Sequence, residues 1–372
     1  MILDRKNKLP VYKQIYEIIL SEINAGVYSK TGLMPTEKDL CARFKAERNT
    51  VRKALQILVD EGRITRRKGS GTRLLQRTAA RYNTILPELC LSGNKSVMFV
   101  TQEDYLNEGD VESFHFKLIN SFDKRLSELG LNLIYKTAGK NGLFSEALHN
   151  AAPSAVIFDS YIHHSIHHEA LRQEIPCISV NHYTPLMTSV VSNNYDGAYQ
   201  VAKSLADAGH KKIALLLGKR SHQTCVERLS GFQSLYMSRG MMLEEKYLFT
   251  GDWHFSSGAD TAEKIAAMKP DERPTAVFAF NDDMAYGCYS SLLRHKFTVP
   301  GDISVVGFDK SDRYEAIFPP LTTVDVNMNS IVDYACWFLI NNLQGKAPST
   351  NAKIQLDVKL VDNGSIMSLN AR

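Results

Sequence analysis

The sequence of 372 residues predicts a small α+β domain at the N-terminus and a larger α/β domain behind it. Residues 11–62 place apolar side chains at helical spacing, and a strand-like pair follows over 63–74. From Ser96 onward, short apolar runs such as 155–158 and 276–280 alternate with longer amphipathic stretches. That alternation is typical of parallel strands covered by helices on both faces. We therefore expect this division: a first domain over 1–75, a linker over 76–95 and a second domain over 96–372.

The overall composition is that of an ordinary globular protein. Hydrophobic residues make up 44% of the chain and charged residues 23%. No apolar run reaches the roughly 18 residues that a membrane span requires, and no secretory signal follows the charged N-terminus. The six cysteines are scattered without a Cys-x-x-Cys pair, as expected of reduced thiols. We expect a cytoplasmic protein that is not bound to a membrane.

Charge is distributed unevenly along the chain. Residues 1–80 hold 17 Lys and Arg against 8 Asp and Glu, whereas the remaining residues hold 27 against 32. A compact basic module joined to a mildly acidic body indicates that one end of the chain binds a polyanion. A solvated basic face would have the same composition, so charge alone leaves both interpretations open.

The basic module is predicted to contain a helix-turn-helix. A first helix covers 11–25, and a second begins at a capping-box pattern formed by Thr36 and Asp39. A short turn over 45–47 leads to a third helix. The buried face of this third helix consists of Val51, Leu55 and Leu58. Two short helices joined by a tight turn form the motif.

The outer face of the third helix carries side chains that suit DNA. Arg48 and Arg52 are four residues apart and project from the same side. Arginine can bind guanine or a phosphate, and Asn49 suits an adenine edge. Thr50 and the first-turn amides can hold a phosphate oxygen. The hairpin that follows has the cations and glycines of a wing: Arg63, Arg66, Arg67, Lys68, Gly69, Gly71 and Arg73.

Four blocks, in order and at the right spacing, resemble the winged helix-turn-helix of the gluconate-repressor (GntR) family. They are residues 10–15 (PVYKQI), 33–40 (LMPTEKDL), 48–55 (RNTVRKAL) and 61–72 (EGRITRRKGSGT). The resemblance implies contacts with double-stranded operator DNA from Lys38, Arg48, Asn49, Thr50, Arg52, Lys68 and Gly69. The charge of the hairpin adds Arg66 and Arg67. Glu47 stands where the family usually has a serine, and a basic helical bundle without a DNA role is the alternative.

The larger domain contains a series of distinctive stretches: 192–198 (SNNYDGA), 208–214 (AGHKKIA), 228–232 (RLSGF), 251–253 (GDW), 274–287 (PTAVFAFNDDMAYG), 299–309 (VPGDISVVGFD) and 319–323 (PPLTT). In these stretches it resembles the effector domain of the lactose/galactose-repressor family, itself similar to periplasmic sugar-binding proteins. The resemblance implies two lobes, each a doubly wound parallel sheet, joined by three crossovers around a ligand cleft. We assign about 96–194 and 329–343 to the first lobe, and about 195–328 and 344–372 to the second.

Residues in these stretches fit a sugar-binding role. Asn281 and Asp309 each follow an apolar run, and ligands of open α/β sheets bind beyond the carboxyl ends of strands. A neutral polyhydroxyl ligand needs planar groups that form paired hydrogen bonds. Arg228 and the two strand-end residues supply these, and Trp253 supplies an aromatic surface. The resemblance assigns all four to effector binding.

The first lobe offers further candidates at its predicted strand ends: Gln102, Tyr105, Asp159 and His182. The resemblance places Asp159 and His182 at cleft positions, although His182 stands where some relatives have an acid. An ordinary loop side chain is the alternative for each candidate, and the identity of the sugar stays open.

The segment from His163 to His168 is a possible metal-binding pattern, because His164 and His168, like His163 and His167, are four residues apart. The pattern does not match a complete metal-ligand motif, so a solvated helix face is the expected role. The sequence lacks the motifs of phosphate loops, dinucleotide-binding turns, nucleophile elbows and zinc peptidases. We expect no metal, no cofactor and no catalysis.

These patterns together predict a homodimeric transcriptional repressor that places two winged helices on a pseudo-palindromic operator and is released by a monosaccharide. The fusion resembles the arabinose repressor group, so an arabinose-like pentose or a hexose such as fucose is the expected effector. One alternative is a purine- or nucleoside-responsive regulator on the same scaffold. Another is a sugar-binding protein or sugar-active enzyme without a DNA role, and activation instead of repression stays open.

Overall fold

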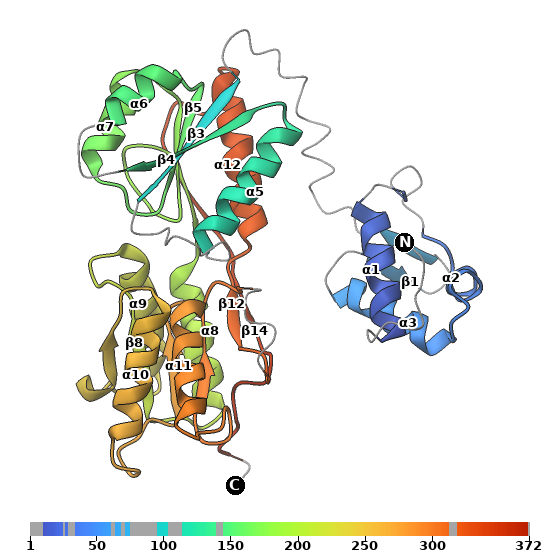
Figure 1. Cartoon of the computed structure of the whole chain (residues 1–372), viewed down its shortest axis with the longest axis vertical. Coiled ribbons are helices and arrows are strands. Elements are labelled where there is room, and N and C mark those ends of the chain that lie inside the picture. The colour runs from blue at the N-terminus through green and yellow to red at the C-terminus, as the bar shows by residue number, and fades with distance from the viewer. Residues whose placement is uncertain are drawn as a thin grey trace. The chain divides into compact units, whose positions relative to one another are not determined.

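The computed structural model describes residues 10–24, 27–28, 34–60, 64–67, 71–74, 95–102, 114–138, 144–311 and 318–370. The chain forms two compact units, Met1–Leu89 and Cys90–Arg372 (Figure 1). None of the helices in the described ranges has the length and apolar character that a membrane crossing demands. Each unit is described by itself.

The N-terminal unit combines helices with a two-stranded antiparallel sheet: α1 (Val11–Asn24), α2 (Glu37–Phe44), α3 (Arg48–Asp60), β1 (Ile64–Arg67) and β2 (Gly71–Leu74). As predicted, Thr36 and Asp39 form a capping box at the start of α2. Lys45, with a left-handed φ of 45°, ends α2 just before α3 begins. The inner helix faces bury Ile15, Ile19, Leu40, Phe44, Val51, Leu55 and Leu58. The predicted helix-turn-helix is confirmed.

The first lobe of the C-terminal unit is a six-stranded parallel sheet in the order β13-β7-β6-β5-β3-β4. Its strands are β3 (Ser96–Gln102), β4 (Asn132–Ala138), β5 (Ala155–Asp159), β6 (Cys177–Val180), β7 (Ser189–Ser192) and β13 (Lys353–Leu356). The helices described in this lobe are α5 (Phe114–Glu128), α6 (Phe144–Ala151), α7 (His164–Arg172) and α12 (Met328–Leu343). Figure 1 shows α5 beside α12 on one face of the sheet, with α6 and α7 on the other.

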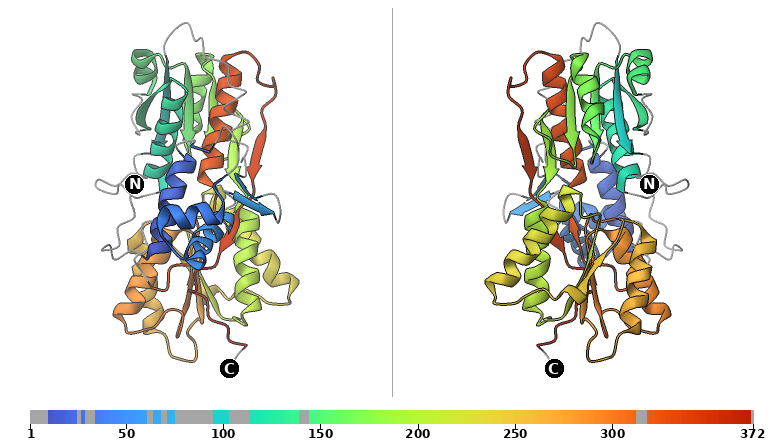
Figure 2. Two further views of the ribbon diagram at one scale, coloured as in Figure 1. Left: turned by 90° about the vertical axis from the view of Figure 1, so that its right-hand side faces the viewer. Right: turned by 90° about the vertical axis from the view of Figure 1, so that its left-hand side faces the viewer.

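The second lobe is a four-stranded parallel sheet in the order β11-β10-β8-β9. Its strands are β8 (Ile213–Leu217), β9 (Leu248–Thr250), β10 (Ala276–Ala279) and β11 (Ser304–Val306). The accompanying helices are α8 (Asn194–Asp207), α9 (Gln223–Ser238), α10 (Phe255–Ala267) and α11 (Asp282–Arg294), with a short 3₁₀ turn, η2 (Glu245–Tyr247). The pairs α8–α9 and α10–α11 cover opposite faces (Figure 2). Because both faces are covered, β8 and β10 are buried over their whole length.

The two lobes are joined where β7 leads to α8, where β12 (Thr323–Asp325) leads to α12, and where β13 leads to β14 (Lys359–Val361). β12 and β14 pair with each other in an antiparallel ribbon. The crossovers also contact one another. The hydroxyl of Ser192 donates to the carbonyl of Val326 at 3.3 Å, and the amide of Asn193 donates to the carbonyl of Leu356 at 2.8 Å.

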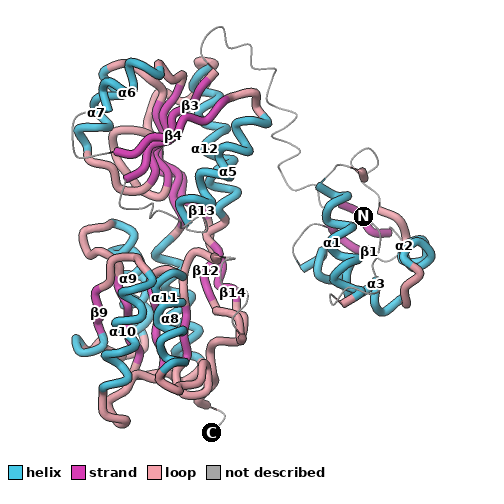
Figure 3. Tube along the Cα trace, in the orientation of Figure 1, coloured by secondary structure: helices cyan, strands magenta, loops and turns pink. Residues whose placement is uncertain are grey.

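The structure corrects one boundary between the lobes. The sequence assigns all of 344–372 to the second lobe, but β13, labelled in Figure 3, pairs with β7. This pairing places Lys353 opposite Ser189 and Leu356 opposite Ser192. β13 therefore completes the edge of the first sheet before the chain crosses over.

Candidate functional site

The predicted DNA-contacting residues of α2 and α3 lie on the surface of the N-terminal unit. Lys38 and Asn49 are exposed, and Thr50 is half-buried. The side chains of Arg48 and Arg52 are 69% and 49% exposed. The two arginines therefore share one accessible face, as their spacing predicts.

Glu37 connects these two arginines, and the sequence analysis did not identify it. Its carboxylate accepts a hydrogen bond from Nε of Arg48 at 2.9 Å and from Nε of Arg52 at 3.1 Å. Only 14% of the Glu37 side chain is exposed. Glu37 is the first residue of α2. The sequence shows an acid at the start of this predicted helix and two arginines in the next one, and this pattern could have suggested the contact.

The predicted wing corresponds to β1 and β2, where Arg66 pairs with Thr72 and Arg67 pairs with Gly71. The structure describes the backbone of these two arginines. The expected wing-tip contacts Lys68 and Gly69 lie outside the described residues. Glu47, where the sequence departs from the family pattern, is exposed immediately before α3.

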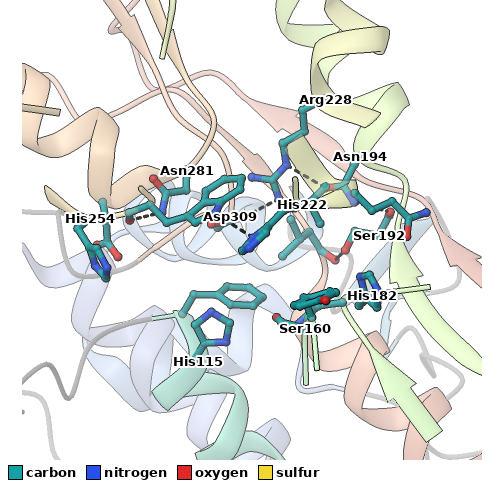
Figure 4. Close-up of a pocket in the computed structure, with 18 residues that line it drawn as sticks. His115, Ser160, His182, Ser192, Asn194, His222, Arg228, His254, Asn281 and Asp309 are labelled. Carbon is teal, nitrogen blue, oxygen red and sulfur yellow. Dashed lines mark hydrogen bonds and ion pairs between the residues drawn. The ribbon is translucent and has the colours of Figure 1, made fainter. Parts of the chain in front are cut away.

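In the C-terminal unit, a cavity of about 980 Å³, including its opening to solvent, lies between the two lobes. Five of the predicted effector residues line it: His182, Arg228, Asn281 and Asp309, which Figure 4 labels, and Trp253. Gln102 is half-buried at the end of β3 and is not part of the lining. Tyr105 lies outside the described residues.

Arg228 is the central cation of the second-lobe wall. Its guanidinium donates to Oδ1 of Asn194 at 2.9 Å, to the carbonyl of Phe280, and to Oδ1 of Asp309 at 3.2 Å. It also lies 3.7 Å from the ring centroid of Phe308. Burial raises the pKa of Asp309 to about 6, although the charge of Arg228 opposes that shift. The wall thus presents a buried, hydrogen-bonded ion pair to the cavity.

Asn281 also has a structural role. Its Oδ1 accepts from the amide of Met284 at 3.0 Å and so caps α11, while its Nδ2 donates to the carbonyl of Trp253 at 2.8 Å. The side chain therefore fixes the loop of Trp253, whose backbone φ is 80°. Asn281 lines the cavity, but its amide already has partners within the protein.

An aromatic stack crosses the cleft from one lobe to the other. Trp253 Nε1 donates to Nδ1 of His222 at 3.1 Å, and the two rings lie 6.0 Å apart at 23°. On its other side, His222 faces Tyr161 of the first lobe, with ring centroids 6.1 Å apart at 23°. Burial, assisted by the charge of Lys219, lowers the pKa of His222 to about 4. The neutral imidazole matches its role as acceptor for the indole.

The first-lobe wall is arranged around Asp159. This residue is fully buried and is not part of the cavity lining, unlike the cleft position that the resemblance implies. It lies behind His115, Ser160 and Asn181, which do line the cavity and which all donate to its carboxylate. His182 lines the same wall, 5.6 Å from Tyr161 in an edge arrangement, and burial lowers its pKa.

Two family models match the chain. One describes bacterial regulatory proteins of the gntR family and covers residues 11–74, and the other describes a periplasmic binding protein-like domain and covers residues 202–366. A segment similar to GntR regulatory proteins is thus followed in the chain by one similar to periplasmic binding proteins. Both resemblances drawn from the sequence are confirmed.

The curated relatives include the HTH-type transcriptional repressor PurR of Vibrio atlanticus, 32% identical over 181 residues, which are 49% of this chain and 53% of that protein. The chain thus spans about half the length of the curated relatives it matches.

Solved structures support the architecture. The transcriptional regulator CelR in complex with cellobiose has a TM-score of 0.66 at 20% identity, over 89% of this chain and 100% of that one. A LacI family transcriptional regulator of Enterococcus faecium with bound ribose has a TM-score of 0.65 at 21% identity, over 73% and 99%. At these identities the likeness shows the fold, and the predicted two-lobe periplasmic binding protein-like domain is confirmed.

The histidine segment of the periplasmic binding protein-like domain is only partly a solvated face. His163 caps α7, and His164 and His168 are exposed, but His167 is 2% exposed and packs edge-on against Phe158. Within the described ranges, no group of three or more His, Cys, Asp or Glu could hold a metal ion.

Proposed function

We propose that this protein is a cytoplasmic, homodimeric transcriptional regulator whose periplasmic binding protein-like domain binds a monosaccharide and thereby releases operator DNA. In this proposal residues 1–75 read DNA, 76–95 form a linker and 96–372 sense the effector. The cleft between the lobes, in which the Arg228–Asp309 pair faces the same cavity as Trp253, is the observation that carries it.

The chemistry of the cleft suits a neutral polyhydroxyl ligand. Carboxylate, amide and imidazole groups from both lobes converge on one cavity, so each hydroxyl can meet both a donor and an acceptor. The aromatic stack offers an apolar surface for the C–H face of a sugar ring. An arabinose-like pentose or a hexose such as fucose is the proposed effector.

The DNA-binding half of the proposal is supported by the cations of α3. Arg48 and Arg52 share one exposed face of a helix-turn-helix, the geometry with which such helices enter the major groove. A dimer would place two such helices on half-sites about one helical turn apart. A tenfold to hundredfold release of DNA requires only about 1.4–2.8 kcal/mol of coupling to the effector.

A purine is the second candidate effector, because two observations favour it. The planar stack of Tyr161, His222 and Trp253 crosses the cleft, and such surfaces suit flat heterocycles as well as sugar faces. The curated relatives are also named as PurR repressors. A purine would bind by stacking, whereas a sugar would depend on the Arg228–Asp309 pair.

Fluorescence anisotropy and calorimetry test the proposal. The full-length protein is titrated with a duplex from upstream of its own gene and with a scrambled duplex, then with arabinose, ribose, fucose, hypoxanthine and adenine. We expect the protein to bind the upstream duplex more tightly than the scrambled one, and a sugar to weaken that binding. Arg52→Ala should lose that preference and keep effector binding, and Asp309→Ala should do the reverse. Equal affinity for both duplexes at low salt, or indifference to every compound, would refute the proposal.

A further inference from the structure

The buried carboxylate of Asp159 organises the first-lobe half of the cleft. It accepts from His115 Nδ1 at 2.7 Å and from Asn181 Nδ2 at 3.0 Å. It also accepts from the hydroxyls of Ser160 and Thr101, each at 3.1 Å. These donors come from separate segments of the lobe, and none of Asp159 is exposed. One acid without solvent contact therefore fixes three side chains that line the cavity.

His115 is the member of this set with a titratable ring. It lies in the first turn of α5, its side chain is 19% exposed, and it lines the cavity. Because Nδ1 is bonded to Asp159, the ring orientation is set and Nε2 is the nitrogen that points away from the acid. A carboxylate held at Nδ1 favours the doubly protonated imidazolium, in which both nitrogens are donors.

The charges that face His115 from the surrounding elements are mostly negative. Asp159 ends β5, Asp309 follows β11, and Asp283 belongs to α11. His222 precedes α9, and its pKa is lowered. Arg228, His182 and His254 are the other basic groups that line the same cavity. Arg228 is paired with Asp309, and Asp159 is the carboxylate bonded to His115.

We propose that His115, oriented by Asp159, is the charged hydrogen-bond donor with which the first lobe recognises an acceptor oxygen of the effector, so that effector affinity falls as the pH rises. The inference rests on the proposed effector-binding function of the cleft. The ligand class is one that presents a hydroxyl or carbonyl oxygen, without a positive charge, to the start of α5. In this role Asp159 is a positioning residue.

The pKa shifts of the cleft give the inference a defined signature. Burial alone would lower the pKa of His115, but Asp159, with Asp309 and Asp283, more than offsets this and raises it above 6.5. Burial raises the pKa of Asp309 to about 6. An effector that needs ionised Asp309 and charged His115 binds best above about pH 6 and below the raised pKa of His115. Affinity then falls about tenfold per pH unit on the alkaline side.

Nuclear magnetic resonance of histidine-labelled, ligand-free protein tests the charge state directly. His115→Gln assigns the His115 signal among the 11 histidines by its disappearance. We expect a titration midpoint above 6.5 in the native protein and a midpoint lower by about one pH unit in Asp159→Asn. A native midpoint at or below 6.5, or one that Asp159→Asn leaves unmoved, would overturn the inference.

Calorimetry between about pH 5.5 and 8.5 tests the contact. Arabinose is the first probe, with ribose and fucose as the second and third. His115→Gln should lose affinity near neutral pH and show no alkaline decline, and Asp159→Asn should move the decline to lower pH. His164→Gln, an exposed histidine of α7, is the matched control and should keep the native profile.

The outcomes separate the inference from the proposed function. A sugar that binds with no alkaline decline, or with a decline that His115→Gln retains, refutes the role of His115 and leaves the sensor function intact. Absence of binding by all three sugars at every pH argues against the proposed sugar sensor. In that case the resonance experiment still decides whether Asp159 holds His115 in its charged form. If Asp159→Asn does not fold, His115→Gln alone decides the contact.

Discussion

Nε of Arg48 lies 2.9 Å from Oε2 of Glu37, so the first residue of α3 is tied to the first residue of α2. The same carboxylate accepts from Nε of Arg52, one turn further along α3. One acid thus aligns two exposed arginines in the same direction. Because both pairs use Nε, contact with bases or phosphates falls to the terminal amino groups.

Glu37→Gln should reduce discrimination between DNA sequences. The amide keeps the shape but removes the charge that orients both arginines, and it also removes a repulsion toward phosphates. We expect the ratio of affinities for the upstream and scrambled duplexes to fall about tenfold, with little loss of affinity for the scrambled one. Anisotropy titrations at one fixed salt concentration measure both values.

Glu47→Gln is the charge-matched control, because Glu47 is an exposed acid immediately before α3. It changes the net charge of the DNA-binding face equally and leaves the Glu37 pairs in place. A ratio that falls equally in both variants would show that charge, rather than orientation of the arginines, is responsible.

Gly218→Ala should disable the effector pocket through Trp253. Gly218 follows β8, and a Cβ there would lie 2.0 Å from the indole ring of Trp253. The ring must move, so it leaves its stack on His222 and its hydrogen bond to that imidazole. We expect effector affinity to fall at least about tenfold. DNA binding by the ligand-free protein should be retained.

Intrinsic fluorescence verifies the cause of that loss. The chain has two tryptophans, so Trp337→Phe isolates the emission of Trp253. The spectrum should shift when Gly218→Ala is added to this background. An unchanged spectrum together with native effector affinity would show that the ring does not need to move.

The order of elements was predictable where strands are long apolar runs. The segments 155–158, 213–217 and 276–280 read as buried strands in the sequence, and they are β5, β8 and β10. β13 gave no such signal, because Lys-Ile-Gln-Leu is a partly exposed edge strand. The lobe boundary near 344 was wrong for the same reason, since only strand pairing places that segment.

The cleft was predicted at its strand ends and missed at its helix starts. Asp309 follows β11 and lines the cavity, as expected of the carboxyl edge of a parallel sheet. Asp159 also lies at the carboxyl end of a strand, but its side chain is buried. The position of a residue at a strand end places it at the edge of the sheet and does not determine where its side chain points. His115 lies in the first turn of α5 and His222 immediately precedes α9, and no spacing in the sequence links them to the cleft.

Gly258→Ala should destabilise the second lobe. A Cβ at Gly258 would lie 2.0 Å from the carbonyl oxygen of Met284, and Gly287 meets the carbonyl of Phe255 in the same way. The obstacle is backbone, so α10 and α11 must separate. We expect a loss of about 1–3 kcal/mol in the free energy of unfolding, measured by urea denaturation. Ser256→Ala, on the exposed face of α10, is the control and should have little effect; equal losses would contradict the close helix contact.

The first lobe should lose stability in mild acid because of His167. Burial, with smaller contributions from His182 and neighbouring histidines, lowers the pKa of His167 to about 4. In the unfolded chain the value returns to about 6.5, so the unfolded state binds more protons as the pH falls between these values. Stability is therefore fully present above 6.5 and declines toward 4. Between pH 7 and pH 5 we expect this residue to lower the free energy of unfolding by about 2 kcal/mol.

His167→Gln tests this, because the amide cannot take up the proton. Urea unfolding followed by circular dichroism at pH 7 and pH 5 should show a smaller decline in the variant than in the native protein. His168→Gln, on the exposed side of the same helix, should retain the native decline. The difference between the native protein and His167→Gln reports on His167 alone. His115 has a raised pKa and acts in the opposite direction, because its contribution to stability is lost as the pH rises. Identical declines in all three proteins would mean that His167 is protonated in the folded lobe, and its packing against Phe158 would then need another explanation.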